Sequence, residues 1–134
     1  MTFRYRYYRE IGCLYTCGKG KVSLQDFIDY HLSIKIENPR PTLLILADYR
    51  ELDASDLSAA DVEKIKASAL RKVETKYEKV KEATVVSDFL MWGLTRQYDG
   101  VFYSETYDLH VFTDIYEARN WLGLDPETVL KIEE

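Results

Sequence analysis

The segment 42–61, TLLILADYRELDASDLSAAD, constrains the fold more than any other part of the chain. Its apolar run from Leu43 to Ala47 is bounded by turn-forming residues, which is typical of a strand buried on both faces of a sheet. Such a strand needs helices on both sides, so we expect the neighbouring elements to cover the sheet. A charged turn from Asp48 to Asp56 is expected after the strand, and a long helix near Ser58.

Ligands of such sheets bind just beyond the carboxyl ends of the strands. We therefore expect ligand or partner contacts at Asp48, Tyr49 and Arg50, with Ser55 and Ser58 at the start of the next helix. Asp48 could hold a ligand or act as a general base. The more ordinary role of such an aspartate is to cap turn amides or to pair with Arg50.

The bulk composition is that of one folded domain spanning residues 1–134. Hydrophobic residues make up 46% of the chain and charged residues 31%. The net charge of −5 argues against general binding of nucleic acid through a basic face. No apolar run approaches the ~20 residues that a membrane span requires, and the N-terminus lacks the apolar core of a signal peptide. The expected location is cytoplasmic.

The two cysteines, Cys13 and Cys17, are expected to be free thiols. Four residues of strand would place their Cα atoms about 13 Å apart, too far for a disulfide. No histidine or further cysteine lies nearby, so we expect no metal site and no cofactor. The chain also lacks the G-x-S-x-G, glycine-rich phosphate-loop and His-Glu metal motifs, and neither His31 nor His110 suggests a triad. We therefore expect a protein that is not an enzyme.

The N-terminal segment alternates aromatic residues with arginine from Phe3 onward, which predicts a half-exposed strand up to Ile11. A second strand-like piece runs from Cys13 to Cys17. The two pieces could form an antiparallel hairpin or one strand bent at Gly12.

Two helices with N-terminal serines flank the central strand. Ser23 with Asp26 predicts a capping box at the first helix, and Ser58 with Asp61 predicts one at the second. The charged residues of the second helix, Lys72 and Lys76 among them, are expected to face solvent. Its predicted inward stripe is Val62, Ile65, Ala69, Val73 and Tyr77.

The rest of the chain alternates short strands with helices. We expect strand 83–86, helix 89–98, strand 109–112, a helix begun by Asp114 and ended by Gly123, and a last short helix at Asp125-Pro126. Crossover helices place the strands that they connect parallel to one another. The predicted fold is thus α/β, with a mixed, mostly parallel sheet, an antiparallel N-terminal edge and about four to five flanking helices.

The segment 89–98 is apolar around most of its helical circumference, so it is either deeply buried or faces a partner. The chain holds 11 tyrosines, and its aromatic residues could line a pocket or an interface or simply fill the core. The candidate ligand- or partner-binding residues here are Phe89, Met91, Trp92, Leu94 and Tyr98.

Four segments resemble the SpoIIAA-like group of STAS domains. They are 20–27 (GKVSLQDF), 44–50 (LILADYR), 83–87 (ATVVS) and 111–123 (VFTDIYEARNWLG), and the last is the most specific. The resemblance covers nearly the whole chain in order and implies a STAS-type fold. The better-known relatives are anti-sigma-factor antagonists, which carry a phosphorylatable serine in an Asp-Ser-Ser-Gly-like motif at the start of the helix after the central strand.

This chain has no Ser-Gly pair at that place, and Ser55 and Ser58 are the nearest equivalents. Both are candidate phosphorylation sites by this resemblance. A serine at a helix start is more ordinarily a cap, and Ser58 has Asp61 as its partner for that role. The neighbouring Asp53, Asp56 and Asp61 would also repel a phosphate.

Two functions follow as hypotheses. The first is a non-enzymatic, STAS-like regulatory or protein-interaction module that docks an unknown partner through the helix at 89–98. The alternative is a carrier of a small apolar or lipid-like molecule in a cleft beside that helix. A homodimer fits either function, because a symmetric copy can cover an apolar helix face.

Overall fold

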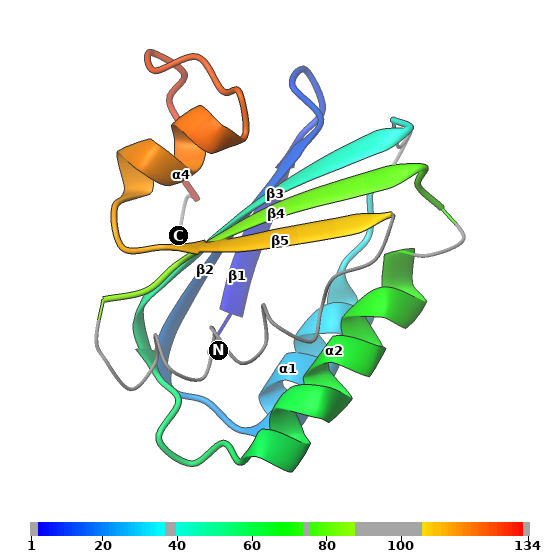
Figure 1. Cartoon of the computed structure of the whole chain (residues 1–134), viewed down its shortest axis with the longest axis vertical. Helices are drawn as coiled ribbons and strands as arrows, with labels where there is room; N and C mark the ends of the chain where they lie inside the picture. The colour runs from blue at the N-terminus through cyan, green and yellow to red at the C-terminus, as the bar shows by residue number, and fades with distance from the viewer. Residues whose placement is uncertain (1–2, 37–39, 74–75, 88–105, 133–134) are drawn as a thin grey trace.

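The computed structural model describes residues 3–36, 40–73, 76–87 and 106–132, and Figure 1 shows one sheet with helices on both faces. The five strands lie side by side in chain order: β1 (Phe3–Tyr8), β2 (Cys13–Lys21), β3 (Thr42–Asp53), β4 (Lys79–Val85) and β5 (Tyr107–Phe112). β1 pairs antiparallel with β2, and the other pairs are parallel. The α/β prediction, with a mixed sheet and an antiparallel N-terminal edge, is confirmed.

The N-terminal strands form a hairpin, which decides the alternative that the sequence left open. Tyr8 pairs with Cys13 across the turn. Gly12 within this turn has a φ of 63°, a left-handed conformation that glycine adopts without steric strain. The chain therefore reverses direction at Gly12 instead of bending there.

Two helices cover one face of the sheet, and a third covers the other (Figure 1). α1 (Leu24–Ser33) and α2 (Ala59–Val73) pack side by side on the first face, and α4 (Ile115–Trp121) packs on the second. The described residues thus hold fewer helices than predicted, and the helix expected at 89–98 lies outside them.

The prediction of a last short helix at Asp125-Pro126 is wrong, because the chain forms a turn there. The Asp125 carboxylate accepts a hydrogen bond from the backbone N–H of Glu127 at 2.9 Å. An aspartate that binds the backbone two residues further on stabilises a turn in competition with a helix.

The predicted helix caps are present. In each capping box the serine hydroxyl accepts from the aspartate N–H, and the aspartate carboxylate accepts from the serine N–H, for Ser23 with Asp26 and for Ser58 with Asp61. Asp114 caps α4 by accepting from the backbone N–H groups of Tyr116 and Glu117. These caps satisfy amides that a helix start leaves without a partner, which explains where the helices begin.

The central strand is longer than the sequence indicated, so the turn expected from Asp48 is wrong. β3 continues to Asp53 because its second half pairs with the end of β2, with Lys21 opposite Asp53. Tyr49 is buried on the face covered by α1 and α2, whereas Arg50 is exposed. This half of β3 is therefore a half-exposed strand.

The first half of β3 is buried on both faces, as predicted. Leu43 and Ile45 pack beneath α1 and α2, whereas Leu46 packs beneath α4. Cys13 and Cys17 are both free, as expected. Within the described ranges, the helices are too short or too polar to cross a membrane.

Loss of the Ser58 cap should destabilise the fold. Ser58→Ala removes the acceptor for the Asp61 N–H, and we expect it to lower the free energy of unfolding by about 1 kcal/mol in urea titrations. Ser55→Ala is the matched control, because the interactions of exposed Ser55 with Asp53 lie at the surface, and its effect should stay within about 0.5 kcal/mol. Equal effects of the two substitutions would contradict the cap assignment.

Candidate functional site

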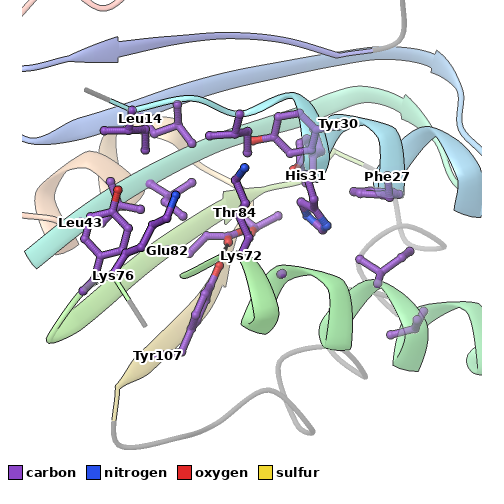
Figure 2. Close-up of a pocket in the computed structure, with 18 of the residues that line it drawn as sticks. Leu14, Phe27, Tyr30, His31, Leu43, Lys72, Lys76, Glu82, Thr84 and Tyr107 are labelled. Carbon is purple, nitrogen blue, oxygen red and sulfur yellow. Dashed lines mark hydrogen bonds between the residues drawn. The ribbon is translucent and has the colours of Figure 1, made fainter. Parts of the chain in front are cut away.

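A cavity of about 80 Å³ lies between the sheet and the helices α1 and α2. Figure 2 shows its lining side chains reaching inward from the strands and from both helices. The sheet contributes Leu14, Leu43 and Ile45, and the helices contribute Phe27 and Ile65 among others. The cavity is therefore enclosed mainly by apolar side chains of elements that are far apart in sequence.

The periodicity of the elements places these side chains. Alternate residues of a strand face the same side, so Glu82 and Thr84 of β4 face the cavity together. On α2 the lining residues follow helical spacings of three and four, and this series ends in a lysine: Val62, Ile65, Ala69 and Lys72. Lys76, which lies beyond the end of α2, also lines the cavity. The inward stripe of α2 thus changes from apolar to cationic toward its C-terminal end.

A buried polar cluster of Glu82, Thr84 and Tyr107 lies in the wall of the cavity. The Thr84 hydroxyl donates to one Glu82 carboxylate oxygen at 2.8 Å, and the Tyr107 hydroxyl donates to the other. Burial raises the pKa of Glu82, and these two hydrogen bonds oppose that shift. Burial is the larger effect, so the pKa of Glu82 is higher than that of an exposed glutamate.

Two further polar pairs line or border the cavity. The hydroxyls of Tyr30 and Thr16 share a hydrogen bond of 2.5 Å, and His31 Nδ1 lies 2.9 Å from the Ser68 hydroxyl. Burial, aided by the nearby charge of Lys72, lowers the pKa of His31 to about 4. His31 is therefore neutral at neutral pH and joins α1 to α2 through a buried hydrogen bond.

Two lysines, Lys72 and Lys76, also line the cavity; Lys72 is half-buried and Lys76 is exposed. Figure 2 shows both side chains directed toward the space between α2 and the strands. Burial lowers the pKa of Lys72, and the charges of Lys76 and Lys35 lower it further. In the part of the chain that the structure describes, neither Lys72 nor Lys76 forms an ion pair, so this part of the lining is cationic.

The predicted group Asp48, Tyr49 and Arg50 is divided between the two faces of β3. Tyr49 lines the cavity. Asp48 and Arg50 lie on the opposite face, where the Arg50 guanidinium donates to both Asp48 oxygens at 2.8 and 2.7 Å. The structure therefore shows the ordinary role of Asp48, pairing with Arg50, and brings only Tyr49 to the cavity.

The candidate serines lie beside the cavity and do not line it. Ser58 belongs to the capping box of α2, and the backbone N–H of Ser55 donates to Asp53 at 2.9 Å. The remaining candidates, in the segment expected to be the third helix, lie outside the described residues: Phe89, Met91, Trp92, Leu94 and Tyr98.

Several cavity residues were missed by sequence reasoning. Lys72 and Lys76 were expected to face solvent, although the spacing of Lys72 from Ala69 continues the inward series of α2. Lys76 lies beyond the helix, where helical spacing gives no signal. Glu82 was missed because β4 begins at Lys79, before the apolar residues that indicated a strand. Its alternation with Val80 and Thr84 is the signal that could have identified it.

Comparisons of this chain with known proteins yield no relative. No protein-family model, no curated protein and no solved structure matches it. In the described ranges, no cluster of three or more His, Cys, Asp and Glu side chains is placed to hold a metal ion. The geometry of the cavity therefore carries the functional interpretation.

The buried histidine should make stability depend on pH. From pH 6.5 down to about 4 the unfolded chain binds a proton that folded His31 does not, so stability falls with pH over this window. The loss should approach about 3 kcal/mol in wild type and should be absent in His31→Leu, as measured by urea unfolding at several pH values.

His110→Leu is the matched control, because His110 lies half-exposed on β5, facing away from the cavity. The His110→Leu protein should keep the wild-type dependence of stability on pH. The contribution of Glu82 is common to all three proteins and cancels when they are compared. A His31→Leu protein that loses as much stability as wild type between pH 7 and pH 4 would contradict the assignment.

Proposed function

We propose that this protein binds a small, largely apolar molecule in the cavity between α1, α2 and the sheet. The observation that carries the proposal is the cavity itself. One water needs roughly 10–15 Å³ on the same measure, so about 80 Å³ provides room for several water-sized groups. This volume is well below the roughly 300–1,000 Å³ of a pocket that holds a whole drug-sized ligand, so the cavity takes only a short apolar part of a ligand.

The chemistry of the wall supports an apolar occupant. The polar groups there are engaged with one another: Tyr30 with Thr16, His31 with Ser68, and Glu82 with its two hydroxyl donors. A ligand would therefore be held mainly by contact with apolar side chains.

Simple energetics set the expected affinity. An unfilled apolar cavity of about 80 Å³ costs on the order of 2 kcal/mol of stability, which a ligand can recover. Each methylene group buried contributes about 0.8 kcal/mol, against which the entropy of association must be set. For a single short chain we expect a Kd on the order of 0.1 to 1 mM.

A STAS-like regulatory or interaction module remains the second candidate. The mixed sheet with its antiparallel N-terminal edge supports it, because the resemblance to SpoIIAA-like domains implied this arrangement. The docking helix at 89–98 lies outside the described residues, so docking there stays a prediction. Phosphorylation at Ser55 or Ser58, a homodimer and a cytoplasmic location also stay predictions. An added mass of about 80 Da on the denatured protein would favour the phosphorylated module.

The neutral probe 1-octanol tests the ligand site. We expect saturable binding to wild type in isothermal titration calorimetry, with a rise in Tm. Ala69→Phe places a ring in the cavity and should weaken binding at least tenfold, whereas Ala67→Phe makes the same change on the exposed face of α2 and should leave binding unchanged.

The milder Ala69→Val covers the case in which Ala69→Phe fails to fold, and it should weaken binding less. Circular dichroism of each variant establishes that the protein is folded. Absence of octanol binding by folded wild type, or equal binding by Ala69→Val and Ala69→Phe when both fold, would overturn the proposed function.

A further inference from the structure

We propose that the ligand is a single-chain anionic amphiphile, whose tail fills the cavity and whose head group binds at Lys72 and Lys76. This inference rests on the proposed function, because it names the chemical class of the molecule in that same cavity. It concerns the charge of the ligand, which the apolar wall by itself does not specify.

The first argument is the position of the charges. Lys72 continues the inward stripe of α2, Lys76 follows beyond the end of the helix, and both side chains reach the cavity that the apolar residues line. Lys76 is exposed, and a head group beside it would keep part of its hydration. An amphiphile with its tail against the apolar wall and its anion at these two lysines would match the apolar and the cationic parts of the site together.

The second argument is the repulsion between lysines. The pKa of Lys72 is lowered by burial and by the charges of Lys76 and Lys35, so these cations destabilise one another. The described part of the chain places no carboxylate in an ion pair with Lys72 or Lys76. A bound anion would supply that missing negative charge and relieve the repulsion.

The third argument concerns the other charge in the cavity. A cationic ligand would have to use Glu82, the acidic residue among the described lining residues. Both of its oxygens already accept hydrogen bonds from Thr84 and Tyr107, and burial raises its pKa. Glu82 is thus already engaged by two hydroxyl donors, whereas the two lysines have no such partner in the part of the chain that the structure describes, so the cavity favours the anionic class.

The test compares three probes with the same chain at pH 7: octanoate, 1-octanol and octylammonium. Titration calorimetry at low ionic strength should show octanoate binding about tenfold more tightly than octanol, and octylammonium more weakly than octanol. Added salt should reduce this preference, because partly exposed charges are screened.

Variants locate the charge effect. Lys72→Gln with Lys76→Gln should remove the preference for octanoate over octanol. Lys64→Gln with Lys66→Gln alters the net charge equally, at positions of α2 that do not line the cavity, and should keep the preference.

The outcomes separate the two proposals. Equal binding of all three probes, or tightest binding of octylammonium, would overturn the anionic head group and leave the ligand cavity standing. A preference for octanoate that survives in the Lys72 and Lys76 double variant would also overturn this inference. Failure of every probe to bind would overturn the proposed function itself.

Discussion

The burial of β3 between β2 and β4 is the constraint on which the rest of the structure depends. Its backbone is paired on both sides, and its apolar side chains alternate between the two faces, Leu43 and Ile45 toward α1 and α2 and Leu46 toward α4. Neither apolar face can remain in contact with water, so helices must cover both. The positions of α1, α2 and α4 follow from this requirement.

The cavity is a consequence of how α1 and α2 cover their face. The buried hydrogen bond between His31 and Ser68 connects the two helices, and burial keeps the imidazole neutral at neutral pH. Beneath them, Thr84 and Tyr107 hold the carboxyl group of Glu82 in the wall, and the side chains of Lys72 and Lys76 line the same cavity. An apolar wall with two lysines suits the proposed ligand, which has an apolar end and an anionic end.

Much of the fold could be predicted because local patterns encode it. Period-two alternation indicated the N-terminal strand, an apolar run indicated the central strand, and the capping boxes at Ser23 and Ser58 marked the helix starts within a residue. The free cysteines also followed from strand geometry alone. Element ends were less predictable: β3 extends to Asp53 because β2 provides a partner there, and pairing with a distant strand leaves no local signal.

The site shows the same division. The sequence by itself determined the helix caps and the apolar part of the inward face of α2, since these depend on residues near one another in the chain. The order of strands and helices along the chain also indicated the mixed α/β fold. Only the tertiary structure decided that Tyr49 lies on the opposite face of the sheet from Asp48 and Arg50. It also decided that Glu82 and Lys72 line the same cavity. A polar residue looks solvent-exposed in sequence, and only the packing of distant elements around it determines whether it lines a cavity instead.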